Sequence, residues 1–95
     1  MKKILITGAS SGLGLYLSKY FNKLNHDLVT VGKSLKKVKS LKNLLNVKNK
    51  KNCFRYDLLN NNELKIFKHK IKKMKFDTVI HCMGGGLGMH DPLIN

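Results

Sequence analysis

A glycine-rich stretch near the start of the chain, TGASSGLG at Thr7–Gly14, constrains the fold more than any other feature. It follows the apolar run KKILI and precedes LYLSKYFNKL, in which apolar residues recur at helical spacing. The free amides at a helix N-terminus form an anion site when such a loop joins a buried strand to the helix. We therefore predict a phosphate-binding turn, with Gly8 at the tight turn, Gly12 beside the pyrophosphate and Gly14 where helix and strand approach closely.

Apolar runs of strand length alternate with segments of helical periodicity along the rest of the chain. Strands are expected at residues 3–7, 28–31, 53–58 and 76–83, with a polar loop at 46–52. The expected inner faces of the three intervening helices are Leu13, Leu17, Tyr20, Phe21 and Leu24; Leu35, Val38, Leu41 and Leu45; and Leu64, Phe67, Ile71 and Met74. The order βαβαβαβ predicts an α/β fold, a Rossmann-like doubly wound parallel sheet of four strands.

Helix caps and the last segment complete this pattern. Ser34 is the expected N-cap of the second helix, and Asn60 or Asn61 that of the third. After the fourth strand come a glycine loop at 84–88 and the pair Asp91–Pro92, which is typical of a helix start.

The charge of the chain is strongly positive, at +14, with a pI of about 10.1. Arg55 is the only arginine, and the lysines are spread through every segment. Arginine is the usual bidentate partner of bases and phosphates, so this pattern favours solvated lysine faces over specific nucleic-acid binding. No apolar run reaches the length of a membrane span, and we expect a cytoplasmic protein with no membrane partner.

The two cysteines, Cys53 and Cys82, lack the spacing of a metal site or a redox pair. We expect reduced thiols and no bound metal. His81, which precedes Cys82 directly, would point to the opposite face of its strand.

The motif TGASSGLG resembles the TGxxxGxG pattern of the short-chain dehydrogenase/reductase family. Further similarities follow in order: VGKS after the second strand, YDL after the third, and HCMGGG where the family has NNAG. The resemblance implies a strand order of 3-2-1-4 and a nicotinamide dinucleotide as cofactor. That order would put Cys53 and Cys82 at opposite edges of the sheet, too far apart for a disulfide.

The resemblance also implies which residues contact the cofactor. Those around its ribose and phosphates would be Gly8, Ser10, Ser11, Gly12, Leu13 and Gly14; Lys33 would meet the adenosine 2′-phosphate; Asp57 and Leu58 would border the adenine; and Cys82, Met83 and Gly84 would line the ribose on the nicotinamide side. Lys33 favours NADP(H) over NAD(H). Ser11 stands where many NADP-binding members have a second basic residue, so this preference rests mainly on Lys33.

The family's catalytic serine and its Tyr-x-x-x-Lys pair have no counterpart in the sequence. We expect residues 1–95 to be the N-terminal part of a single NAD(P)-binding Rossmann domain, truncated, with the catalytic half absent. On this view a small-molecule substrate binds only to a full-length form, the 95-residue chain alone is inactive, and the exposed edge of the fourth strand can drive self-association. Two alternatives remain open: a non-catalytic nucleotide-binding module and a basic protein that binds polyanions.

Overall fold

The computed structural model describes residues 1–82 and contains one four-stranded parallel sheet, with the strands in the order β3-β2-β1-β4. The strands are β1 (Lys3–Thr7), β2 (Asp27–Gly32), β3 (Cys53–Arg55) and β4 (Thr78–His81). The helices are α1 (Gly12–Lys23), α2 (Leu35–Leu44), α3 (Val47–Lys50) and α4 (Asn61–Ile71). The predicted doubly wound α/β fold and its strand order are therefore confirmed, while the segments predicted after residue 82 lie outside the described residues.

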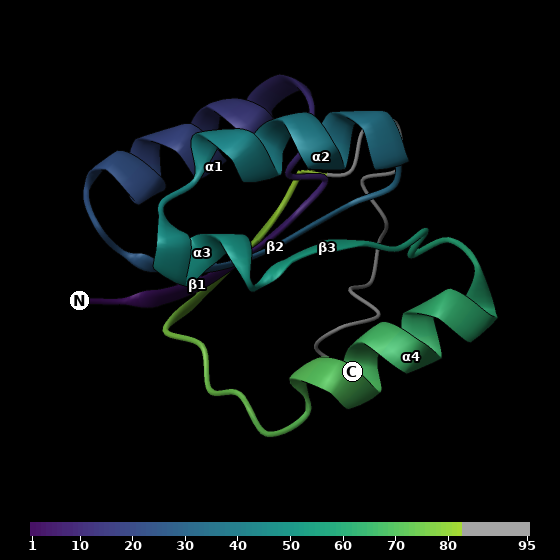
Figure 1. Ribbon diagram of the computed structural model, residues 1–95. Coiled ribbons are helices and arrows are strands. Elements are labelled where there is room, and N and C mark those ends of the chain that lie inside the picture. The colour runs from purple at the N-terminus through teal and green to yellow at the C-terminus, as the bar shows by residue number, and fades with distance from the viewer. Residues whose placement is uncertain (83–95) are drawn as a thin grey trace.

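Helices cover both faces of the sheet: α1 and α2 lie on one face and α4 on the other (Figure 1). Parallel strands need crossover connections, which are right-handed. The strand order runs one way from β1 to β3 and then reverses to β4, so α1 and α2 cover one face and α4 the other. Strand β1 lies between β2 and β4, with Ile6 paired to Thr30 on one side and Ile80 on the other. The residues that follow β1 are thus at the centre of the sheet's carboxyl edge.

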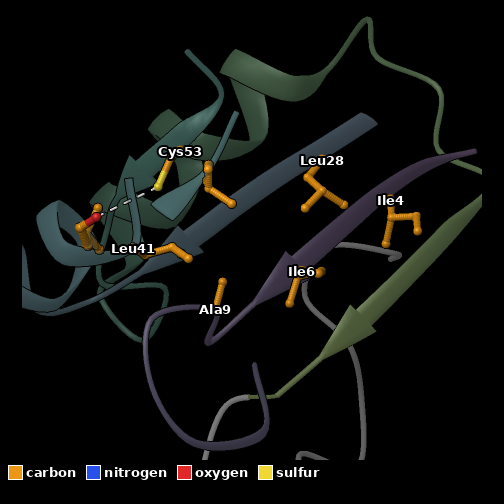
Figure 2. Packing of buried hydrophobic residues seen from close by; sticks show 8 residues of the cluster. Ile4, Ile6, Ala9, Leu28, Leu41 and Cys53 are labelled. Carbon is orange, nitrogen blue, oxygen red and sulfur yellow. Dashed lines mark hydrogen bonds between the residues drawn. The ribbon is translucent and has the colours of Figure 1, made fainter. Parts of the chain in front are cut away.

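Each face of the sheet carries its own apolar cluster. Ile4, Ile6 and Leu28 point toward α1 and α2, where they meet Leu41 and Cys53 (Figure 2). The alternate residues Leu5, Val29 and Val31 lie on the other face, where they pack with Leu58 and with Phe67 of α4. This alternation is the period of two expected for strands that are buried on both faces.

Helix α1 does not bury the face that its apolar residues predicted. Leu17 and Phe21 pack on the core, but Leu13 is 64% exposed, Leu24 50% and Tyr20 47%. The buried residues of α1 are Gly14 and Ser18. Small residues let the helix approach the strands closely, and Leu13, Tyr20 and Leu24 are turned outward. A smaller error of the same kind affects α2, where Leu35 is exposed while Val38, Leu41 and Leu45 are buried.

The segment predicted as a polar loop contains the short helix α3, capped by the Asn46 side chain, which accepts a hydrogen bond from the amide of Asn49. Asn49 is almost fully buried at 1% exposure. Its Oδ1 accepts from the amide of Leu28 at 2.8 Å, and its Nδ2 donates to the carbonyl of His26 at 3.0 Å and to Oδ1 of Asn22 at 3.1 Å. One side chain thereby ties α3 to the end of α1 and the start of β2.

The third and fourth strands are shorter than predicted, yet their ends continue the sheet's hydrogen bonding. The amide of Tyr56 donates to Gly32 at 3.0 Å, and that of Cys82 donates to Thr7 at 3.0 Å. Cys53 and Cys82 are both free and belong to opposite edges of the described sheet, as the strand order predicted.

We predict that Asn49→Ala lowers the free energy of unfolding by about 2–4 kcal/mol, because it removes the partner of the buried Leu28 amide and of the half-buried His26 carbonyl. Urea unfolding followed by circular dichroism measures the change. Asn43→Ala, at an exposed position of α2, is the matched control and is expected to shift stability by less than about 0.5 kcal/mol. Equal effects of the two substitutions would contradict the role assigned to Asn49.

Candidate functional site

A cavity of about 520 Å³ lies at the carboxyl edge of the sheet. Open α/β sheets bind ligands at this edge, where the chain reverses its direction of winding. The lining comes from the loop after β1, from the end of β2 and the start of α2, from the loop after β3, and from the residue that follows β4: Gly8, Ser10, Ser11, Val31, Gly32, Lys33, Ser34, Lys37, Arg55, Tyr56, Asp57, Leu58, Leu59 and Cys82.

The glycine loop adopts its shape because two of its positions need glycine for their backbone conformation and a third needs it for lack of space. Gly8 has a φ of 64° and Gly12 a φ of 55°, a region that L residues rarely adopt. A Cβ at Gly14 would collide with the carbonyl of Gly8, whereas a Cβ at Gly12 would meet nothing within 4 Å. Gly14 is thus required by the fold, and Gly12 faces open space beside the first turn of α1.

The loop is also held against β2. The amide of Ala9 donates to the carbonyl of Val31 at 3.0 Å, which extends the sheet hydrogen bonds beyond β1. A Cβ at Gly32 would overlap the side chain of Ser10. Gly32 therefore allows the loop and the end of β2 to approach closely, a requirement that the sequence analysis did not identify.

The N-terminus of α1 differs from those of the other described helices. The side chains of Ser34, Asn46 and Asn60 accept hydrogen bonds at the starts of α2, α3 and α4. Ser11, the N-cap of α1, forms no such bond, and the first turn of α1 contains no acidic residue. The first amides of α1 therefore have no side-chain cap, and the positive end of the helix dipole is open to an external anion.

Three basic residues line the cavity on the side of β2 and β3. Arg55 is held firmly: its Nε donates to the carbonyl of Lys33 at 2.8 Å, and its Nη1 lies 2.9 Å from Oε1 of Glu63. The other two are Lys33 and the exposed Lys37, in the first turn of α2. Of these three residues, only Lys33 was predicted from the sequence. Lys37 could have been found from its position three residues after the predicted cap Ser34, whereas Arg55 reaches the cavity through the pairing of β3 with β2.

The turn after β3 forms the far wall. Oδ1 of Asp57 accepts from the amide of Leu59 at 3.0 Å, and the amide of Asp57 donates to Oε1 of Glu63 at 3.0 Å. Leu58 is 7% exposed and packs in the α4-side cluster, so it anchors this wall to the core.

Cys82 closes the cavity beside β4. Burial raises the pKa of its thiol, so the neutral thiol rather than the thiolate is present at neutral pH. His81 precedes it, and its Nδ1 lies 2.8 Å from Oγ1 of Thr7. Within residues 1–82, no three metal-ligating side chains gather into a group, and no helix combines the length and apolar character needed to cross a membrane.

Seven of the twelve predicted site residues line this cavity: Gly8, Ser10, Ser11, Lys33, Asp57, Leu58 and Cys82. Gly12 lines an adjoining cavity of about 430 Å³ between α1 and α2, together with Ser10, Ser11 and Lys37. Leu13 and Gly14 lie in the first turn of α1 and line neither cavity. Met83 and Gly84 lie outside the described residues.

The sheet topology and the glycine loop define a nucleotide-binding class of α/β fold. The chain matches the family described as short chain dehydrogenase over residues 2–92, and it belongs to that family. A short-chain dehydrogenase/reductase from Vibrio parahaemolyticus, known from its crystal structure, is 31% identical with a TM-score of 0.71 over 94% of this chain. The match covers 43% of that protein, so the chain spans less than half of its length. No curated protein matches the chain at a significant level.

We predict that Gly14→Ala destabilises the fold by about 2 kcal/mol or more, because the added methyl group cannot fit against the Gly8 carbonyl. The sign is informative, since glycine to alanine within a helix otherwise stabilises by about 1 kcal/mol. A thermal melt followed by circular dichroism measures the effect. Ser40→Ala, at an exposed position of α2, provides the comparison, and a gain in stability for Gly14→Ala would contradict the close contact.

Proposed function

We propose that this chain is the dinucleotide-binding part of an NAD(P)-dependent oxidoreductase of the short-chain dehydrogenase/reductase type and that it prefers NADP(H). The observation that carries the proposal is the uncapped N-terminus of α1 beside a cavity with lysines on its opposite wall. Family membership supports the cofactor class, because the family binds nicotinamide dinucleotides in general.

The residues present fit such a cofactor. The pyrophosphate needs backbone amides and room to approach them, and Gly12 supplies both, since nothing lies within 4 Å of the Cβ position. The adenosine end fits between the end of β2 and the turn after β3, with Lys33 on one side and Asp57 and Leu58 on the other. The nicotinamide end then extends toward Cys82, at the carboxyl end of β4.

The roles of the residues in this proposal are binding and orientation. The amides of the glycine loop hold the pyrophosphate, Lys33 pairs with the 2′-phosphate, and the turn at Asp57 limits the space for adenine. When bound, the nicotinamide supplies the hydride transfer that oxidoreductases of this type perform. Cys82, whose thiol pKa is raised further by burial, contributes surface rather than a nucleophile.

The first test of the proposal is Gly12→Val. The valine side chain would occupy the space proposed for the pyrophosphate, so NADPH binding is expected to fall below detection. Binding is measured by the enhancement of NADPH fluorescence on titration with the chain.

The control for this test must carry the same backbone strain. Asn25 has a φ of 67° and lines neither cavity, so Asn25→Val places a valine in the same left-handed conformation away from the site. Asn25→Val is expected to retain binding at temperatures where it is folded. Unchanged NADPH affinity of folded Gly12→Val would overturn the assignment of the pyrophosphate site.

The second test concerns cofactor preference. Lys33→Asp is expected to weaken NADPH binding roughly ten- to a hundredfold, because a charge-assisted contact to the 2′-phosphate becomes a repulsion, and to change NADH binding far less. Lys39→Asp, at an exposed position of α2 that lines neither cavity, makes the same change in net charge. Equal losses for NADPH and NADH in the Lys33 variant would remove this residue from the proposed role.

A further inference from the structure

We propose that Lys37 is a second specificity-determining residue, which pairs with the adenosine 2′-phosphate together with Lys33. The inference rests on the proposed function and extends it to a residue of α2. It follows from three observations: the position of Lys37 at the junction of the two cavities, the fixed backbone at that position, and the distribution of ion pairs around the cavity.

Three residues line both cavities: Ser10, Ser11 and Lys37. The first turn of α2 therefore faces the glycine loop across the space where the cavities meet. Ser11 brings no charge to that space. Lys37, which comes from α2 on the opposite wall, supplies a positive charge to that space.

The backbone at Lys37 is fixed by the cap of α2. Ser34 accepts a hydrogen bond from the amide of Lys37 at 3.3 Å, and Val38, the next residue, is buried in the core. Lys33, Ser34 and Lys37 thus form one turn at the carboxyl edge of β2, and all three line the larger cavity. The lysine side chain remains exposed, so its ammonium group can reach a ligand without leaving a buried site.

Lys37 and Arg55 differ in their ion pairs within residues 1–82: Arg55 is paired with a carboxylate, and Lys37 is not. Those pairs are Lys48 with Asp27 and Arg55 with Glu63. Arg55 therefore already has a carboxylate partner and also donates to the Lys33 carbonyl. Asp57 is the carboxylate of the larger cavity, and its Oδ1 accepts from the amide of Leu59.

A phosphate monoester carries a charge of about −1.5 to −2 at neutral pH, which two lysines can balance and one cannot. Lys33 and Lys37 are the two cations of this wall that no carboxylate of the described residues pairs with. We therefore expect both to contribute to the recognition of the 2′-phosphate.

The test compares 2′,5′-ADP with 5′-AMP as probes, since both carry adenosine and the 5′-phosphate and they differ in the 2′-phosphate. Calorimetric titration of the 95-residue chain at low salt gives both affinities. Lys37→Gln is expected to weaken 2′,5′-ADP binding roughly three- to tenfold, as suits an exposed charged contact, and to leave 5′-AMP binding unchanged. The difference should shrink as salt is added, because exposed charges are screened.

Lys39→Gln is the matched control, since it removes the same charge from an exposed position of the same helix that lines neither cavity. Equal losses for the Lys37 and Lys39 variants would overturn the proposal in favour of a general effect of net charge. An unchanged ratio of the two affinities in the Lys37 variant would overturn it while the proposed function stands. Failure of the wild-type chain to bind either probe would instead overturn the proposed function itself.

Discussion

The arrangement of this molecule depends on the contact between the first turn of α1 and the backbone of Gly8. A side chain at residue 14 cannot fit there, and Ser18, one turn later, is also small and buried. Oγ of Ser18 donates to the carbonyl of Gly14 at 2.7 Å and lies 3.4 Å from the carbonyl of Ala9. These residues bring α1 directly onto the loop, and its N-terminus therefore opens at the carboxyl edge of the sheet.

The same contact explains which parts of the fold could be predicted from the sequence. The strands were predictable in kind because short apolar runs such as Ile4–Ile6, rich in β-branched residues and followed by a glycine-rich stretch, favour a buried strand. The orientation of α1 was not predictable from hydrophobicity. The apolar pattern placed Leu13 and Tyr20 on the buried face, but the close approach of the helix to the loop buries the small residues Gly14 and Ser18 instead. Helix α3 was missed because its stability comes from the contacts of Asn49 with Asn22, His26 and Leu28, which are distant in sequence.

The candidate site was predictable where a residue is part of a local motif and less so where position depends on pairing between strands. Ser10 was found as part of the glycine motif, and Lys33 and Asp57 were found near the ends of the second and third strands, where the family resemblance implies cofactor contacts. Arg55 reaches the cavity because β3 pairs with β2 so that Arg55 lies beside Gly32, and its guanidinium then bonds Lys33 and Glu63. Nothing in the run CFRYDL by itself indicates those partners.

Acidic residues are scarce in this chain, and three of the four within residues 1–82 join two segments. Asp27 pairs with Lys48 of α3, Asp77 accepts from the amide of Lys3, and Glu63 connects α4 to Arg55 and to the turn at Asp57. The hydrogen bond with Lys48 lowers the pKa of Asp27, so this contribution to stability is present above the carboxyl's unfolded pKa and is lost as the pH falls through its folded pKa. The carboxylates thus act as cross-links between neighbouring elements within a chain of otherwise positive charge.

The missing side-chain cap at Ser11 has a consequence for the evolution and engineering of this chain. An aspartate at position 11 would accept hydrogen bonds from the first turn of α1 and complement its dipole, which stabilises a helix by about 1 kcal/mol. The same carboxylate would repel a pyrophosphate from those amides. Thermal stability and the proposed cofactor binding would therefore have opposite requirements at this one position, and selection for heat resistance alone would favour a residue that opposes the proposed binding.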